Sequence, residues 1–352
     1  MEMIKTRSVE EMRKTLEMPD YEFPHKLFDE NEHLKNNVAL LCLGGSLSYG
    51  TNLPGKGDTD LRGVFMETPH EIIGSKPNPQ KVVDNETDTV MYSFNRIVEL
   101  LLENNPNTIE MLGTREDHRF IVNTLGKKLL DNRKMFLSKR CIQSFNGYAA
   151  DQFRRLENAL ARDRLSEERK AYHVMKSMEK SMASFDDQFA LSPYGKARLF
   201  TDKDADGNPE ICIDIDYKRF PVREFNSFMN VLTNVYRAYN KQNHRNHKKD
   251  DEHLDKHAMH LMRLYYMGID ILEKGEIITF RAAEQDLFRE VRRGKFRKPD
   301  GTYDDAFFDW KAEQEARFEY AAKHTELPDV ADPEWVNEFK FECNKMLIER
   351  KC

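Results

Sequence analysis

Two short motifs contain the residue types that phosphate and metal chemistry needs. Gly44-Gly45-Ser46 follows an apolar run, and Asp58-Thr59-Asp60 comes after eleven further residues. Glycines after a strand let the backbone turn tightly and approach a ligand without a Cβ clash, and free N–H groups at the start of a helix suit a phosphate. On a strand, Asp58 and Asp60 point to the same face with Cα atoms about 6.7 Å apart. Such a pair can converge on hard divalent cations.

The elements expected around these motifs form a small sheet. The short apolar run 38–43 ends at two glycines and predicts a buried strand. Further strands are expected at 61–66 and within 80–92. Apolar residues at helical spacing predict a helix over 93–104, with Ser93 as its N-cap and Pro106 beyond its end.

From about residue 124 the sequence changes to long, charged, helix-favouring stretches. Helices are expected at 124–137, 139–162, 166–189, 221–240 and 251–274, with a hairpin near 198–217. The fold class is therefore α+β, a small mixed sheet followed by a mostly helical domain. The expected parts are an N-terminal lead-in (1–35), a catalytic domain (36–120), a helical substrate-binding domain (121–300) and a C-terminal helical extension (301–352).

Strand, GGS and then DxD resembles the DNA polymerase β-type nucleotidyltransferase superfamily. More narrowly, the sequence resembles the RNA-ligase-associated predicted nucleotidyltransferase family of bacteria and phages. The segments that carry this resemblance are GGSLSYGTN, GDTDLRGVF, DTVMYSFNRIVELLLENNPNTIEML and KKDDEHLDKHAMHLMRLYYMGIDILEKGEI, spread over about residues 38–295. The resemblance implies a nucleotidyltransferase palm for the sheet.

The resemblance also implies a third carboxylate on a later strand. Asp88 is the best positional match, although Asp84 and Glu86 lie close to it. Asp58, Asp60 and Asp88 would then be the catalytic residues and the ligands of Mg²⁺, with Mn²⁺ as the alternative ion. Asp88 would also be the general base toward an acceptor hydroxyl. The competing interpretation is structural: Asp58 and Asp60 in a solvated turn, and Asp88 at the start of a strand.

Nucleotide-binding residues follow from the same resemblance. They are Gly44, Gly45, Ser46, Lys256, His257, His260 and Arg263. Lys56 is added only for its proximity to the DxD motif, because the loop here departs from the superfamily, which often has a serine directly before DxD where this chain has Gly57. Gly45 and Ser46 would hold the β and γ phosphates, and the four residues from 256 to 263 would line the cleft opposite the carboxylates. Helical spacing brings His257, His260 and Arg263 within about two turns of one another. A solvated helix face and a zinc site are the alternatives.

A basic run near residue 290 is the expected nucleic-acid-binding surface. Its members are Arg289, Arg292, Arg293 and Lys295, with Phe288 and Phe296 interleaved. Cations and aromatic rings together suit a phosphate backbone and stacked bases. An ordinary exposed helix end with a positive bias has the same pattern.

The predicted activity is Mg²⁺-dependent transfer of a nucleoside monophosphate from an NTP to an acceptor hydroxyl, with release of pyrophosphate. The resemblance implies an RNA end, similar to that of tRNA, as acceptor, and an RNA ligase as a functional partner. Two alternatives stay open: a transferase that modifies a protein side chain, as an AMPylating toxin does, or a small molecule, and a nucleotide- or RNA-binding module without catalysis.

Composition narrows the classes further. The net charge of −6 argues against a protein that coats nucleic acid non-specifically. No apolar run approaches the ~20 residues of a membrane span, and the N-terminus has no apolar signal region, so we expect no membrane partner and a cytoplasmic location (that of the host if a phage encodes it). The five cysteines are scattered, which supports neither a disulfide framework nor a cysteine zinc site.

Residues 202–207 resemble the start of a calcium loop, but a hairpin turn is the favoured interpretation.

Overall fold

The computed structural model describes residues 4–5, 25–52, 59–74, 77–164, 175, 194–207, 209–245, 251–299 and 302–350. Asp58, Lys56 and most of the helix expected at 166–189 lie outside these ranges. The strands are β1 (Ile4–Lys5), β2 (Val38–Leu43), β3 (Leu61–Phe65), β4 (Lys81–Asp84), β5 (Thr89–Ser93), β6 (Arg119–Val122), β7 (Gly195–Lys203) and β8 (Pro209–Tyr217).

Helices account for most of the remaining structure. The α-helices are α2 (His25–Glu30), α3 (Gly45–Tyr49), α4 (Pro69–Ile72), α5 (Phe94–Leu102), α6 (Pro106–Ile109), α7 (Thr124–Asp131), α8 (Arg140–Arg164), α10 (Val222–Arg245), α11 (Asp251–Lys274), α12 (Gln285–Arg292), α13 (Asp305–His324) and α14 (Pro333–Glu349). Short 3-10 helices are η1 (Glu110–Gly113), η2 (Glu116–His118) and η3 (Arg133–Phe136).

The chain divides into two compact units. The first contains Met1–Phe153, Asp255–Lys298 and Tyr303–Cys352, and the second contains Arg154–Leu254 and Pro299–Thr302. The expected helical domain 121–300 therefore contributes to both units.

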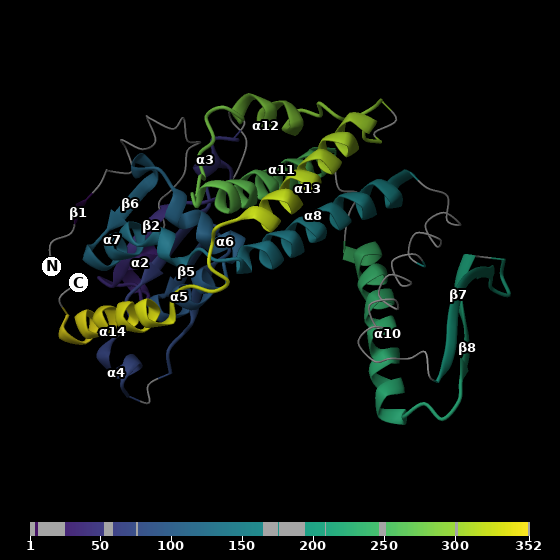
Figure 1. Ribbon diagram of the computed structural model, residues 1–352, viewed down its shortest axis with the longest axis horizontal. Helices are drawn as coiled ribbons and strands as arrows, with labels where there is room; N and C mark the ends of the chain where they lie inside the picture. The colour runs from purple at the N-terminus through teal and green to yellow at the C-terminus, as the bar shows by residue number, and fades with distance from the viewer. Residues whose placement is uncertain are drawn as a thin grey trace. The chain divides into compact units, whose positions relative to one another are not determined.

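A mixed sheet is the centre of the first unit (Figure 1). Its strand order is β1-β6-β2-β3-β5-β4, with β3 and β5 parallel and the other neighbours antiparallel. The residues of β2 from Ala39 to Leu43 are all buried, which explains the continuous apolar run in the sequence. The sheet followed by a mostly helical region confirms the predicted fold class.

The helix that follows β5 anchors the C-terminal helix to the sheet. Apolar residues of α5 at helical spacing are buried, including Phe94, Ile97 and Val98. The ring of Phe94 lies 6.3 Å from that of Phe339 on α14, and Trp335 of the same helix packs edge-on against Phe136. Helix α14 therefore packs on the body of the unit.

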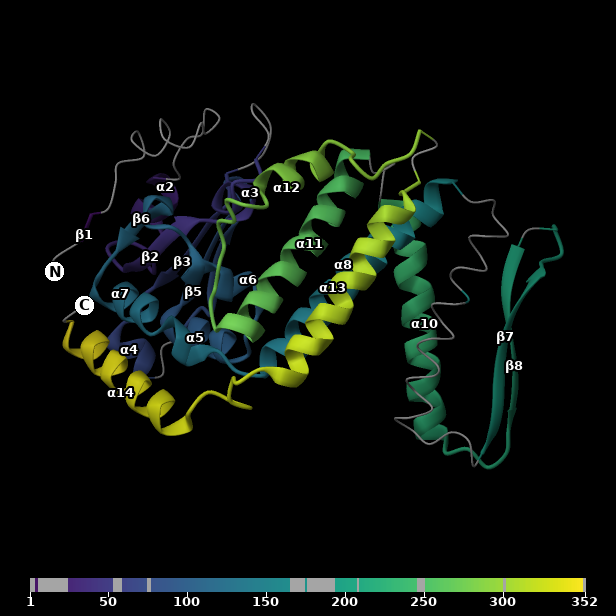
Figure 2. The ribbon, with the colours of Figure 1, turned by 45° about the horizontal axis from the view of Figure 1, so that its top comes forward.

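Three long helices lie side by side next to the sheet (Figure 2). They are α11, α13 and the first part of α8. Tyr265 of α11 stacks edge-on against Trp310 and Phe318 of α13. Gly268 of α11 lies against Phe145 of α8, where a Cβ would approach the ring to 3.2 Å. Helix α11 is thus packed against α8 and α13, and its Tyr266 also contacts Phe288 of α12.

The second unit contains the hairpin β7–β8 and the whole of α10. Its core consists of Met175, Leu199, Phe228 and Leu232. At the tip of the hairpin Gly207 has a φ of 84°, and the amide of Asp206 donates to Asp204 Oδ1. The acidic stretch 202–207 is therefore a hairpin turn, as predicted.

Candidate functional site

Asp60 and Asp88 are neighbours where two parallel strands begin. Leu61 of β3 is in register with Thr89 of β5, so the residues directly before them lie on adjacent strands. Such strands are about 4.8 Å apart. The amide of Leu61 donates to the carbonyl oxygen of Asp88 at 3.2 Å, which holds the two strand starts together.

Arg62 joins the two aspartates. Its Nη2 donates to Asp60 Oδ1 at 3.2 Å, and its Nη1 donates to the carbonyl oxygen of Asp88 at 2.6 Å. Burial raises the pKa of Asp60; the charge of Asp88 also raises it, whereas Arg62 and Lys256 lower it. Added positive charge would therefore stabilise the ionised form of the partly buried Asp60 carboxylate.

The turn before β5 distinguishes Asp88 from the other two acidic candidates. The carboxylate of Asp84 accepts from the amide of Glu86 at 3.0 Å and from the hydroxyl of Thr87 at 2.8 Å, so it stabilises the turn. Glu86 is exposed in that turn. Asp88 is exposed and has a φ of 47°, an uncommon conformation for a side-chain-bearing residue. Such strain concentrates at functional positions.

The glycine loop, Gly44-Gly45-Ser46, lies directly against Asp60. A Cβ on Gly45, which has a φ of 53°, would lie 1.6 Å from Asp60 Oδ2. A Cβ on Gly44 would lie 2.7 Å from Arg62 Cγ, and the amide of Gly44 donates to the carbonyl oxygen of Asp60 at 2.8 Å. The missing Cβ of Gly45 therefore leaves room for the Asp60 carboxylate, and the missing Cβ of Gly44 leaves room for the side chain of Arg62.

Helix α3 continues from this loop toward α11. It begins at Gly45 and contains Ser46, which is half-buried. The helix ends with Tyr49, and Gly50 follows in the left-handed conformation with a φ of 71°. Tyr49 is buried, so α3 links the glycine loop to the interior of the unit.

The sequence-predicted residues of α11 face the same region. Lys256 is exposed and within electrostatic range of Asp60. His257 Nδ1 lies 3.1 Å from Gln152 Oε1. Burial lowers the pKa of His260 well below its usual value, and the cations around it, including Arg263 and Lys256, lower it further. His260 is therefore neutral at pH 7, and the positive charge of this helix face resides on Lys256 and Arg263.

Arg263, Glu110 and Tyr49 form a buried group between three elements. Arg263 Nη2 donates to Glu110 Oε2 at 3.2 Å, the Tyr49 hydroxyl donates to the same oxygen, and the guanidinium carbon lies 3.2 Å from the centre of the Tyr49 ring. Burial raises the pKa of Glu110, and Arg263 opposes that shift. Glu110 thus connects α3, η1 and α11, which is a structural role.

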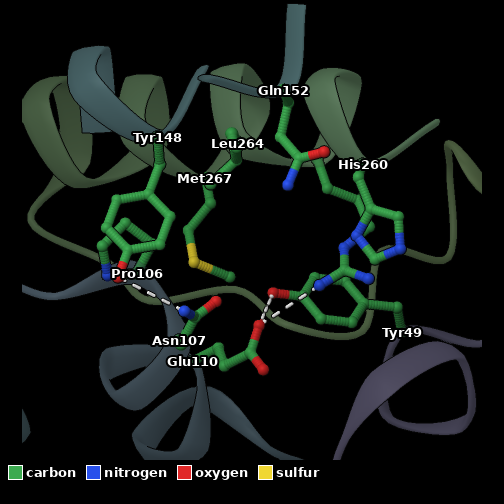
Figure 3. A pocket seen from close by; sticks show the side chains of 10 residues that line it. Tyr49, Pro106, Asn107, Glu110, Tyr148, Gln152, His260, Leu264 and Met267 are labelled. Atoms are coloured by element: carbon green, nitrogen blue, oxygen red, sulfur yellow. Dashed lines mark hydrogen bonds and ion pairs between the residues drawn. The ribbon is translucent and has the colours of Figure 1, made fainter. Parts of the chain in front are cut away.

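A pocket opens beside this group (Figure 3). It is lined by Tyr49, Pro106, Asn107, Glu110, Tyr148, Gln152, His260, Arg263, Leu264 and Met267. Of these residues the sequence analysis had assigned only His260 and Arg263 to a ligand. Tyr148 and Gln152 lie one helical turn apart on α8 without any recognisable motif, so no local signal identifies them.

The basic run has mixed surroundings. Arg292 is buried and donates to the carbonyl oxygen of Thr51 at 3.1 Å, so it does not belong to an exposed surface. Lys295 forms an ion pair with Glu290 at 2.6 Å. Arg289 is half-buried and Arg293 is exposed. The amphipathic helix α12 therefore directs only part of the run outward.

The carboxylate edge, by which we mean the strand starts that carry Asp60 and Asp88, has the chemistry of a divalent-cation site. Its donors are carboxylate oxygens, which Mg²⁺ prefers, and the space that a Cβ of Gly45 would fill is taken by Asp60 Oδ2. Within the described part of the chain, no three His, Cys, Asp or Glu residues form a group that could hold a metal ion. Asp58, the other expected ligand, lies outside that part.

Comparison with known proteins assigns the sheet-containing segment. Residues 23–178 match the RNA repair pathway DNA polymerase beta family. The match confirms the resemblance found in the sequence, and the family indicates a DNA polymerase β-like nucleotidyltransferase involved in RNA repair. No curated protein and no solved structure matches the chain. The matched segment includes the glycine loop and both carboxylates, whereas α11 lies beyond it.

Among the described residues, no helix is long and apolar enough to cross a membrane.

Proposed function

We propose that the protein is a Mg²⁺-dependent nucleotidyltransferase that moves a nucleoside monophosphate from an NTP to the terminal hydroxyl of an RNA. The observation that carries the proposal is the placement of Asp60 and Asp88 at adjacent strand starts, against a loop that must be glycine. When bound, Mg²⁺ would neutralise charge on the phosphates and on the leaving pyrophosphate.

Each residue of the site has a role in this proposal. Asp60 and Asp88, together with Asp58, hold the metal, and Asp88 accepts the proton of the attacking hydroxyl. The backbone of Gly45 and Ser46 binds the β and γ phosphates. Lys256 is exposed and within range of Asp60, so its ammonium group meets the triphosphate from the opposite side.

Arg62 has a role that the sequence did not reveal. It neutralises Asp60 and holds the backbone of Asp88, which keeps two carboxylates close together when no cation lies between them. Its position two residues after Asp60 on a strand, and hence on the same face, is the signal that could have identified it.

Acceptor identity rests on the family match and on the basic surface. The family is connected with RNA repair, and Arg293 is exposed on the turn after α12. An RNA end with a free hydroxyl is therefore the proposed acceptor, and an RNA ligase acting on the same ends is the proposed functional partner. A protein acceptor is the alternative that the experiment must separate.

Transfer of labelled nucleotide tests the proposal directly. The purified chain is incubated with Mg²⁺, each labelled NTP in turn and mixed tRNA, and the label is followed on RNA and on protein bands. Asp60→Asn and Asp88→Asn should each lower transfer by at least about 100-fold, equivalent to roughly 2.7 kcal/mol of activation free energy.

Glu86→Gln is the matched control, because Glu86 is an exposed acid in the turn that carries Asp88. It should retain full activity. Unchanged transfer by Asp60→Asn and Asp88→Asn would reject the site, and label on protein bands alone would reject RNA as acceptor.

A further inference from the structure

The pocket beside Arg263 has almost no net charge of its own. The positive guanidinium of Arg263 lies against the negative carboxylate of Glu110, and His260 is neutral at pH 7. A phosphate group placed here would add a charge without a free counter-ion, which is unfavourable away from water. A neutral polar ligand suits this pocket better.

The side-chain amides of Asn107 and Gln152 face into the pocket, and in each of them one of the two polar atoms already has a hydrogen-bond partner (Figure 3). Asn107 Nδ2 donates to the hydroxyl of Tyr148 at 3.3 Å, which leaves its oxygen toward the cavity. Gln152 Oε1 lies 3.1 Å from His257 Nδ1, which leaves its NH₂ group toward the cavity. The pocket therefore presents one acceptor and one donor, a combination that matches the edge of a nucleobase.

The remaining walls suit a flat, apolar surface. The ring of Tyr148 and the side chain of Met267 border the cavity in Figure 3, and Pro106 and Leu264 complete its lining. Aromatic rings stack on bases irrespective of sequence, and a thioether packs favourably against aromatic rings.

The buried side chain of Arg263 points independently to ligand binding in this pocket. Its side chain is 9% exposed, and its Nε and Nη1 atoms have no hydrogen-bond partner within the described residues. Buried donors without partners destabilise a protein. Oxygen atoms of a nucleoside, on the base or on the ribose, would supply the missing acceptors.

The pocket adjoins the carboxylate edge. Helix α3 starts at Gly45 beside Asp60 and ends at Tyr49 in the pocket wall, a span of about 7 Å at 1.5 Å per residue. The charges of Arg62 and Asp60 also act on Glu110. A nucleotide with its phosphates at the glycine loop can therefore reach the pocket with its base.

We propose that this pocket binds the nucleobase of the NTP. Tyr148 and Met267 contact the faces of the base, Asn107 and Gln152 bind its edge, and Arg263 donates to its oxygen atoms or those of the ribose. The proposal rests on the proposed function, since it specifies how that site selects a nucleoside triphosphate over a plain polyphosphate.

Isothermal titration calorimetry of the full chain with Mg²⁺ tests the pocket separately from catalysis. The probes are the α,β-methylene analogues of the four NTPs, which cannot transfer a nucleotide, and inorganic tripolyphosphate, which has no base. At least one analogue should bind ten or more times tighter than tripolyphosphate. Asn107→Ala and Gln152→Ala should each weaken that analogue about fivefold and leave tripolyphosphate unchanged.

Gln143→Ala is the matched control, because Gln143 is exposed on the same helix as Gln152. It should change neither affinity, and Asn107 is itself exposed, so its replacement should leave the fold intact. Equal affinities for every analogue and for tripolyphosphate would overturn the proposal, as would variants that weaken both kinds of probe equally.

The outcomes also separate this proposal from the proposed function. Base-dependent binding in a protein that transfers no nucleotide would reject the transferase and keep the pocket. Nucleotide transfer with KM values unchanged in Asn107→Ala and Gln152→Ala would keep the transferase and reject the pocket.

Discussion

Replacement of Gly45 by alanine should disable the site through a single added carbon. The new Cβ would lie 1.6 Å from Asp60 Oδ2, whereas real contacts of this kind essentially never fall below 3.0 Å. The carboxylate must therefore move by more than about 1 Å, and a misplacement of that size costs roughly 100-fold in rate. The φ of 53° adds about 1–2 kcal/mol of backbone strain for a residue with a Cβ.

Gly275→Ala separates the two effects. Gly275 has a φ of 62° and no atom within 4 Å of its would-be Cβ, so its replacement introduces only the backbone strain of about 1–2 kcal/mol. Any further loss of stability in Gly45→Ala reports the displaced carboxylate and its broken contact with Arg62, which we expect to contribute about 1 kcal/mol more.

Urea unfolding and nucleotide transfer provide the two readouts. Gly45→Ala should unfold at a lower urea concentration than Gly275→Ala and should lose about 99% of the transfer activity, while Gly275→Ala remains active. Equal stability and full activity of Gly45→Ala would show that Asp60 does not need the position described, and the reasoning about the glycine loop would be wrong.

Three further predictions concern buried polar groups. Burial lowers the pKa of His118 to about 4, although Asp117 opposes the shift, so the folded protein should lose stability as the pH falls below about 6.5. In urea unfolding, the His118→Phe variant should be more stable than the parent protein by about 2 kcal/mol at pH 5, and the two proteins should be nearly equal in stability at pH 7.5. Stability curves that stay parallel across this pH range would contradict the prediction. Glu110→Gln leaves the buried charge of Arg263 without its counter-ion, so it should lower the free energy of unfolding in urea by about 3–5 kcal/mol. The control Glu116→Gln, at an exposed position, should change the free energy of unfolding hardly at all. Equal urea midpoints for the two variants would show that the ion pair does not stabilise the fold. The side chain of Asn104 donates to the carbonyl oxygens of Leu101 and Phe136 and accepts from the amide of Ser138. Asn104→Ala removes these three hydrogen bonds, so it should lower the free energy of unfolding by about 2–4 kcal/mol and lower the thermal midpoint. An unchanged thermal midpoint would refute this prediction.

Local patterns predicted most elements of the first half of the chain. The strand at 38–43 has the expected limits, and the interval 80–92 contains the two strands β4 and β5 in place of one. Strand β6 was not predicted, because its four residues, which follow the 3-10 helix η2 and precede α7, are too few to show a clear alternation of apolar and polar side chains. Its pairing with β2 is a long-range contact that only the folded sheet reveals.

The site itself was predictable in part. The motifs identified Asp60, the glycine loop and Asp88, but the parallel register that makes the two aspartates neighbours depends on tertiary structure. Charge alone did not distinguish buried Arg292 from exposed Arg293, because a long arginine side chain tolerates either environment. The pocket residues of α8 belong to a helix whose role depends on what packs against it.

The first compact unit is discontinuous in sequence. Its carboxylates belong to residues before Phe153, whereas Arg263 and Lys256 follow an intervening unit of about a hundred residues. During synthesis, the acidic half of the site emerges from the ribosome well before its cationic half. A product that stops within the intervening unit would therefore contain Gly45, Asp60 and Asp88 but lack Lys256 and Arg263 of α11, so a match over residues 23–178 does not by itself establish a complete site.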